Sequence, residues 1–246
     1  MEQTQLKPVI YVANDRLSRT YKWEQTSDYL NGGIDVISVN DIAKKMDDIV
    51  VYDTPNYNQG DVYIRHPYLK GKYMKATREY VDVFEDVFHA MSNIMQYLGV
   101  TKMSAKITLE EAYKKVVDGK GNITKGGLGV DFDIKTSKEQ LSSKAKKMCI
   151  EYANPKVNYQ AALNEAHENG LISMPKVETL LKQRNPNGEG SSMTKYTIEV
   201  DVSQKMEESL DIALTLKVVK AFKISGNYSE SLEKRYKMKY ELEIEF

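Results

Sequence analysis

The last eleven residues constrain the fold most, because apolar and charged side chains alternate there without exception. The apolar positions are Tyr236, Met238, Tyr240, Leu242, Ile244 and Phe246, and a Lys or Glu stands between each pair. A period of two is typical of a half-buried β-strand. Eleven residues at about 3.3 Å each span about 36 Å, so the sequence predicts an unusually long strand with one apolar and one charged face.

Weaker alternation predicts further strands upstream. The segments are Met103–Ile107, Leu128–Ile134, Met148–Tyr152, Tyr196–Val202 and Ile212–Ile224, the last interrupted by Lys220. Successive alternating segments joined by short turns predict an antiparallel meander. Thr108 and Glu111 fit a capping box and favour a short helix to Val117, although a strand that extends to Val117 is the competing interpretation.

Two helical regions interrupt this strand pattern. From about Lys72 to Leu98, apolar residues recur every three or four positions, and Gly99 ends the predicted helix. A helical insert is predicted at about residues 155–184, with a pause at Asn169–Gly170, and a loop follows over Asn185–Ser192. We expect the long helix to cover the apolar face of the sheet.

The first seventy residues predict an irregular region that wraps over the core or is offered to a partner. Short apolar runs at Val9–Val12 and Ile49–Tyr52 predict strands, and Asn31–Gly33 and Asn58–Asp61 have turn composition. In the distinctive segment Val62–Tyr68, Pro67 favours a tight turn before the long helix, but the segment indicates no mechanism.

Together these patterns predict an α+β fold in a single domain, residues 1–246. Residues 1–70 form the irregular wrapping or interaction region, residues 72–98 the long helix, and residues 101–246 an antiparallel sheet with the insert at about 155–184. Long amphipathic strands that end at the last residue are expected to leave an open sheet edge there.

Composition limits the classes of function. The 246 residues include 35 Lys and Arg against 35 Asp and Glu, and one cysteine. A disulfide framework is excluded, and the lack of a basic excess disfavours nucleic acid as a partner. No apolar run approaches the length of a membrane-spanning helix, and the polar N-terminus favours a cytoplasmic protein. An acidic stretch, Asp28–Asp61, and a basic stretch, Lys217–Lys239, could meet within the fold or between copies.

No motif assigns a catalytic, cofactor-binding or metal-binding residue. The glycine-rich stretch Gly119–Gly127 lacks the ending of a phosphate loop and predicts a hairpin-type turn. His66, His89 and His167 stand at no zinc-ligand spacing with one another or with Cys149. Ser143 and Lys146 match the Ser-x-x-Lys pattern, but that pair works when its serine opens a helix, and this segment predicts the start of a strand. We therefore expect no cofactor.

Three functional classes follow. The favoured one is a non-enzymatic assembly or interaction protein that self-associates or docks a protein partner through sheet edges and opposed charged patches. The first alternative is a pore-forming effector whose long strands convert into a membrane barrel, and only this alternative implies a membrane partner. The second is a metal-dependent nuclease, because Asp118, Asp133 and Lys135 are similar in spacing to the PD-(D/E)xK nuclease motif.

Overall fold

The computed structural model describes residues 6–23, 33–46, 57–117, 123–126, 148–153, 156–188, 193–215 and 233–246. It contains both helices and antiparallel strands, so the predicted α+β class is confirmed. Two predicted strands, Ile49–Tyr52 and Leu128–Ile134, lie outside these residues.

The described residues of the N-terminal region form a four-stranded sheet in the order β2-β1-β3-β4. Its strands are β1 (Val9–Ala13), β2 (Ile34–Ser38), β3 (Val62–Arg65) and β4 (Tyr73–Lys75), and its helices are α1 (Asp15–Trp23) and α3 (Val39–Met46). Strands β1 and β2 are parallel, and the other pairs are antiparallel. The predicted strand at Val9–Val12 is confirmed, but the described part of this region is more regular than expected. Strand β1 is buried along its whole length, and such strands show no alternation in the sequence.

The long helix is α4, Tyr80–Tyr97. It begins eight residues later than Lys72, where the sequence predicts its start, because Tyr73–Lys75 pair with β3 instead. The end is as predicted: Gly99 follows the helix with a φ of 81°. Ten residues of α4 are buried, and they include the apolar positions from Tyr80 to Met95 that predict the helix.

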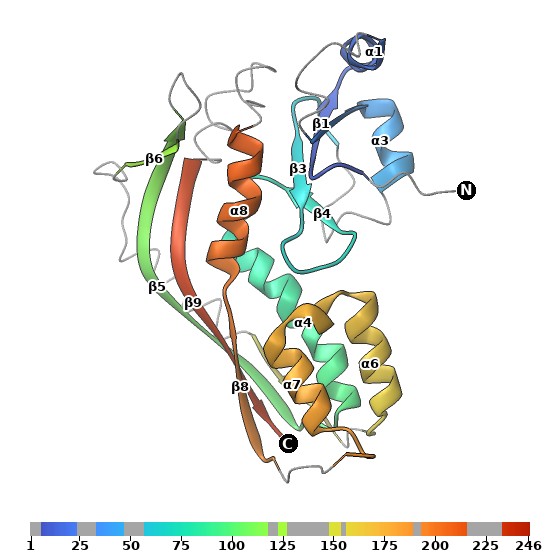
Figure 1. Cartoon of the computed structure of the whole chain (residues 1–246), viewed down its shortest axis with the longest axis vertical. Coiled ribbons are helices and arrows are strands. Elements are labelled where there is room, and N and C mark those ends of the chain that lie inside the picture. The colour runs from blue at the N-terminus through green and yellow to red at the C-terminus, as the bar shows by residue number, and fades with distance from the viewer. Residues whose placement is uncertain are drawn as a thin grey trace.

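The long sheet has the strand order β6-β5-β9-β8, with β7 also paired to β5. Its strands are β5 (Lys102–Val117), β6 (Ile123–Gly126), β7 (Cys149–Glu151), β8 (Lys195–Val200) and β9 (Lys234–Glu245). Figure 1 shows β5 and β9 running side by side along the length of the molecule, with the helices on one side. All strand pairs of this sheet are antiparallel, as predicted.

Strand β5 corrects the favoured interpretation of Thr108–Val117, which was a short helix. The strand continues to Val117 because β9 pairs with it from Lys102 to Lys114, with a register shift between Leu109 and Glu111. Strand β6 pairs antiparallel with the end of β5, so Ile123–Gly126, part of the turn predicted over Gly119–Gly127, is a strand, and the rest of that turn lies outside the described residues. Long-range pairing therefore outweighs the local capping signal.

Strand β9 corrects the expectation that the C-terminal strand leaves an open edge. It lies between β5 and β8 and pairs with both. The described edge strand on that side of the sheet is β8.

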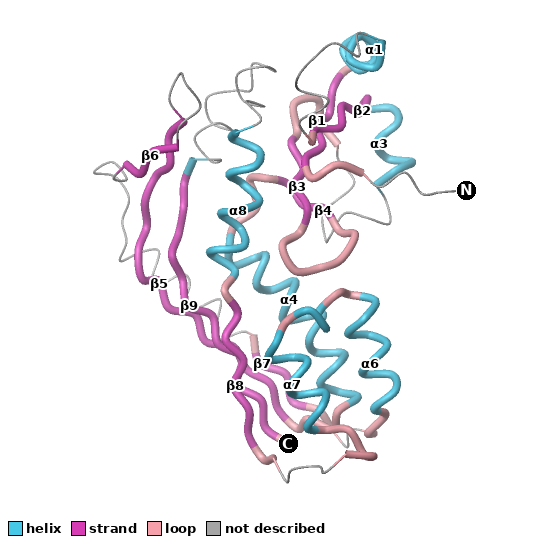
Figure 2. The backbone as a smooth tube through the Cα atoms, viewed as in Figure 1, coloured by secondary structure: helices cyan, strands magenta, loops and turns pink. Residues whose placement is uncertain are grey.

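The predicted helical insert is confirmed as α6 (Tyr159–Glu168), a short 3₁₀ turn η1 (Leu171–Ser173) and α7 (Pro175–Gln183). The Asn158 side chain caps α6 by accepting the Ala161 N–H at 3.1 Å. Gly170 separates the two helices with a φ of 77°. Figure 2 shows α6 and α7 beside the lower part of α4.

A further helix, α8 (Val202–Thr215), replaces the first part of the strand predicted from Ile212. Its buried apolar residues are Val202, Met206, Leu210 and Ala213, at helical spacing. The Asp201 carboxylate accepts the Gln204 N–H at 3.0 Å and caps the helix. The remainder of that predicted strand, Leu216–Ile224, lies outside the described residues.

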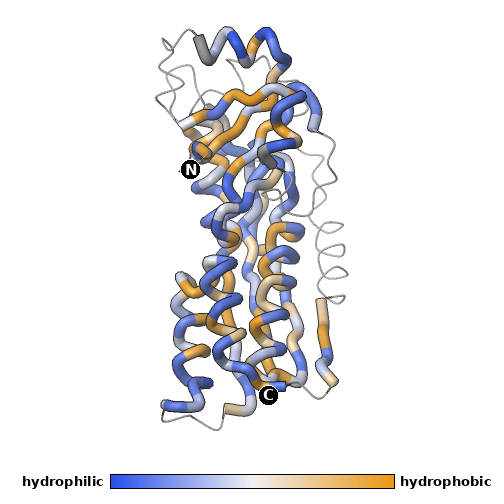
Figure 3. The backbone as a smooth tube through the Cα atoms, turned by 90° about the vertical axis from the view of Figure 1, so that its right-hand side faces the viewer, coloured by the Kyte–Doolittle hydropathy of each residue, from blue (hydrophilic) through white to orange (hydrophobic). Residues whose placement is uncertain are grey.

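Helices α4 and α8 both pack on the long sheet, so the expected cover by α4 is confirmed and α8 adds to it. The Phe84 and Tyr240 rings lie 4.6 Å apart, and the Tyr80 and Tyr236 rings lie 5.4 Å apart. One set of packed buried side chains includes residues of both sheets, for example Tyr11 and Leu242. Figure 3 shows hydrophobic and hydrophilic residues alternating along helices and strands.

Candidate functional site

The edge of β8 is the first candidate site, and its hydrogen-bond pattern follows from its register with β9. The Phe246 N–H donates to the Thr194 carbonyl at 2.9 Å, so these two residues form a hydrogen-bonded pair of the antiparallel ladder. Such pairs recur at every second residue. The residues of β8 whose backbone groups face β9 are therefore Tyr196, Ile198 and Val200.

The intervening residues, Lys195, Thr197 and Glu199, direct their N–H and C=O groups away from β9. All three are exposed, and no strand among the described residues pairs with this side of β8. We call the strand Lys195–Val200, with this unpaired side, the β8 edge. It presents the backbone pattern to which another strand can add.

The side chains of the β8 edge alternate between two faces. Ile198 and Val200 are buried on the inner face, where the Tyr196 hydroxyl donates to the Lys176 carbonyl of α7 at 3.3 Å. On the outer face, Lys195 pairs with Glu245 at 3.1 Å, and Glu199 lies 3.9 Å from Lys239. These exposed ion pairs stabilise the chain little, so both charges can pair with a partner at small cost.

The β8 edge ends at Val200 because α8 begins there. Ser203, on the first turn of α8, occupies the side of β9 that β8 leaves uncovered. Its hydroxyl accepts the Met238 N–H at 2.8 Å and lies 3.2 Å from the Met238 carbonyl, to which it can donate. Because Ser203 is buried, this contact satisfies backbone groups of β9 that would otherwise lack a partner.

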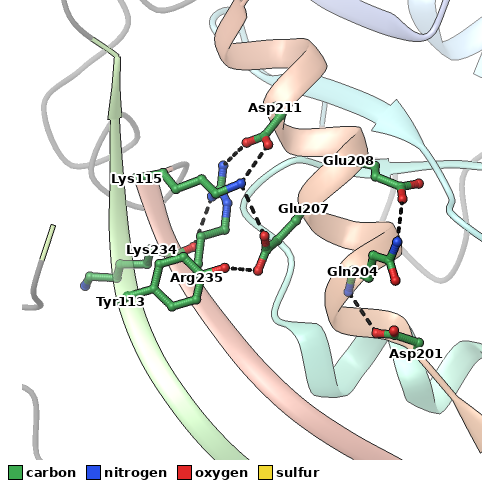
Figure 4. Close-up of polar contacts among 9 residues, drawn as sticks. All are labelled: Tyr113, Lys115, Asp201, Gln204, Glu207, Glu208, Asp211, Lys234 and Arg235. Atoms are coloured by element: carbon green, nitrogen blue, oxygen red, sulfur yellow. Dashed lines mark hydrogen bonds and ion pairs between the residues drawn. The ribbon is translucent and has the colours of Figure 1, made fainter. Parts of the chain in front are cut away.

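A polar network fastens the middle of α8 to β5 and β9 (Figure 4). Lys115 lies 2.7 Å from Asp211 and 3.2 Å from Glu207, and the Tyr113 hydroxyl donates to Glu207. Arg235, which is fully buried, lies 3.6 Å from Asp211. Two cations therefore face two carboxylates, and the network fixes the middle of α8 against β5 and β9.

The pKa shifts in this network agree with that role. Burial and the hydrogen bond to Glu207 raise the pKa of Tyr113, so the phenol stays protonated and donates. Burial lowers the pKa of Lys115, but its contacts with Asp211 and Glu207 outweigh burial, so the net shift is upward. Both groups keep the protonation state that the network needs at neutral pH.

A groove of about 650 Å³ lies between the start of α8 and the long sheet. Its charged lining residues are Glu110, Glu111, Lys125, Glu199, Asp201, Glu207, Lys237 and Lys239. Glu111 pairs with Lys125 at 2.5 Å, and Glu110 lies 3.9 Å from Lys237. The groove adjoins the β8 edge through Glu199 and Val200.

A buried polar cluster links the N-terminal sheet to α4. The two nitrogens of His66 have different neighbours: Nδ1 accepts the N–H groups of Tyr68 and Leu69 at 3.2 and 2.9 Å, and Nε2 lies 3.5 Å from Asp86. Asp86 also accepts a hydrogen bond from Arg78 at 2.8 Å. Burial lowers the pKa of His66 and raises that of Asp86. This cluster holds the turn after β3, so the predicted turn in Val62–Tyr68 is present, but it leads to β4 rather than to the helix.

The residues of the nuclease hypothesis, Asp118, Asp133 and Lys135, lie outside the described residues, as do Ser143 and Lys146, and this hypothesis stays a prediction. Cys149 is exposed on β7, as its alternation predicts. In the part of the chain that the structure describes, no group of three or more His, Cys, Asp or Glu side chains is arranged to hold a metal ion.

The two charged stretches are only partly described, and several of their described members have partners nearby. In the acidic stretch, Asp61 lies 3.3 Å from Lys75. In the basic stretch, Lys239 lies 3.0 Å from Glu241, and Arg235 is buried beside Asp211. Association of these stretches between copies stays a prediction.

Sequence reasoning missed the β8 edge as a site, along with the α8 network and the His66 cluster. The spacing of Val202, Met206, Leu210 and Ala213 behind Asp201 is a signal that could have identified α8. No local signal identifies β8 as the edge strand, because that depends on which strands pair with β9.

No helix among the described residues is both long and apolar enough to cross a membrane. Comparison with known proteins finds no family model, no curated protein and no solved structure that matches this chain. The function is therefore inferred from the geometry of the chain itself.

Proposed function

We propose that the protein is a non-enzymatic interaction protein that binds a protein partner by strand addition at the β8 edge. One observation carries the proposal: Lys195, Thr197 and Glu199 turn their backbone donors and acceptors outward on an exposed strand. An added strand would satisfy these groups in the same way as β9 satisfies the other side of β8.

The β8 edge is held rigidly, which favours binding because little order must be created when a partner arrives. Its inner side chains, Ile198 and Val200, are buried in the core. Its outer side chains, Lys195 and Glu199, carry opposite charges near the two ends of the strand. The backbone would supply affinity, and the two charges would set the register of the partner.

Site-specific photo-cross-linking tests this function. A photoreactive amino acid at position 197, introduced in the cells that naturally make the protein, is expected to give a discrete covalent protein adduct. The matched control is position 106, because Lys106 is exposed on β5, a strand of the same sheet that β9 separates from β8. An adduct from position 197 but not from position 106 supports the proposal. Equal adducts from both positions, or none from position 197, contradict it.

A further inference from the structure

We infer that the partner strand at the β8 edge is the same strand of a second copy of this chain, in an inference that rests on the proposed function. The two copies would be related by a two-fold axis at Thr197. The two long sheets would then join into one continuous antiparallel sheet. The charges and the hydrogen-bond pattern of the β8 edge carry this inference.

The hydrogen-bond pattern is compatible with self-pairing. In an antiparallel pair, residues with outward backbone groups must face residues that also have outward groups. With Thr197 opposite its own copy, Lys195 faces Glu199 of the second copy, and Glu199 faces Lys195. The three outward-facing residues of one copy therefore lie opposite the same three residues of the other, and each pair can exchange both of its N–H···O bonds.

The charges select this register over its neighbours. It places a lysine opposite a glutamate at both ends and a threonine opposite a threonine in the centre, which are favourable cross-strand pairs. A shift by two residues in one direction would place Glu199 opposite Thr197, and the reverse shift would place Lys195 opposite Thr197. A closed two-fold contact is also the commonest form of self-association.

Lys195 and Glu199 are exposed enough to pair with a second copy. The side chains of Lys195 and Glu199 are 75% and 67% exposed, and the intramolecular partners of each lie on β9 at the outer face. Thr197 is exposed between them. A second copy would therefore exchange weak surface pairs for cross-strand pairs at the joined edge.

Charge reversal measured by light scattering tests the inference. We expect the wild-type mass to rise from monomer to dimer between about 1 µM and about 1 mM. The single variants Lys195→Glu and Glu199→Lys place like charges opposite each other at both ends, so each is expected to weaken the dimer at least tenfold. The double variant Lys195→Glu/Glu199→Lys restores opposite charges and is expected to recover the dimer.

The double variant separates the intermolecular effect from changes within one chain. In the single and the double variants alike, Lys195→Glu places a negative charge beside Glu245, and Glu199→Lys places a positive charge beside Lys239. The repulsion within one chain is therefore not relieved in the double variant. Recovery of the dimer can then come only from pairing between copies. Thr197→Pro is a further control: its N–H points away from β9, so the substitution removes no described ladder bond, yet it should abolish the dimer. Circular dichroism checks that each variant is folded.

Three results would overturn the inference: a wild-type monomer at every concentration, a dimer that the single variants leave unchanged, or a double variant no better than the single ones. The cross-linking at position 197 distinguishes these failures from failure of the proposed function. A monomer that still gives an adduct with a different protein there retains the proposed function with another partner. A chain that forms neither the dimer nor an adduct contradicts both.

Discussion

His66 is buried with polar neighbours at both ring nitrogens, and this makes the stability of the fold sensitive to its protonation. Two backbone N–H groups donate to Nδ1, so the proton of the neutral ring is on Nε2, which faces Asp86. A second proton can therefore add only at Nδ1, and it would break these two hydrogen bonds. Burial is the largest influence on the pKa of His66 and lowers it below its ordinary 6.5. The neutral form is therefore the one that the folded protein holds.

This shift predicts a pH dependence of stability. Below about pH 6.5 the unfolded chain binds a proton at His66 that the folded protein does not bind, so the free energy of unfolding falls as the pH falls. The raised pKa of Asp86 acts in the opposite direction at lower pH, because there the folded protein takes up the proton first. Between about pH 7.5 and 5.5 we expect the His66 effect to dominate.

The variant His66→Asn tests this at the residue scale, because an Asn oxygen can accept the Tyr68 and Leu69 N–H groups but does not titrate. Urea unfolding should show that the variant is less stable by about 1–2 kcal/mol at pH 7.5, since it loses the contact with Asp86. Its free energy of unfolding should fall less steeply than that of the wild type toward pH 5.5. Identical pH slopes would show that His66 does not cause the dependence.

At the scale of elements, α8 decides where the β8 edge ends. The helix buries one side against β9 and α4 and exposes the other, and two of its residues separate these roles. Leu210 is 2% exposed, whereas Ile212 on the same helix is 43% exposed. Packing of the first side holds Ser203 against β9.

Leu210→Ala is expected to destabilise the protein by about 2–5 kcal/mol, because it removes buried methyl groups and leaves a cavity. Ile212→Ala, the matched control, is expected to change the free energy of unfolding by less than about 1 kcal/mol. Thermal and urea unfolding of both variants measure the difference. Equal effects of the two substitutions would mean that α8 does not pack through Leu210.

The elements differ in how well the sequence predicts them. Strand β9 was predictable because its two faces meet different surroundings, so the sequence alternates along its length. Helix α4 was predictable from its apolar spacing and Gly99, except that Tyr73–Lys75 pair with β3 over a long sequence separation. Helix α8 was missed because Ile212, Leu214 and Leu216 alternate as in a strand, whereas its helical spacing begins ten residues earlier at Val202.

The candidate site was less predictable than the fold, for a physical reason. Strand β8 is the edge strand because it pairs with β9 on one side, while the other side of β9 pairs with β5. The sequence of β8 alternates like that of any half-buried strand and carries no mark of an edge. The partners of the buried residues His66 and Arg235 are Asp86 and Asp211, which also come from other elements of the chain, so local sequence does not identify them.

At the scale of the whole molecule, the central claim is that the long sheet is incomplete at the β8 edge and is completed by another strand. Self-pairing about Thr197 would double the sheet and leave β8 without an exposed edge in the dimer. Because the Lys195 and Glu199 contacts would lie at the outer face, salt should weaken the dimer by screening them.

Amide hydrogen exchange, resolved by residue and measured at low and high protein concentration, tests this claim most directly. At low concentration we predict fast exchange at Lys195, Thr197 and Glu199, and slow exchange at Tyr196, Ile198 and Val200, which bond to β9. At high concentration the first three should become protected. Slow exchange at those three residues at every concentration would show that the chain itself covers the edge, and fast exchange at every concentration would contradict pairing with a second copy.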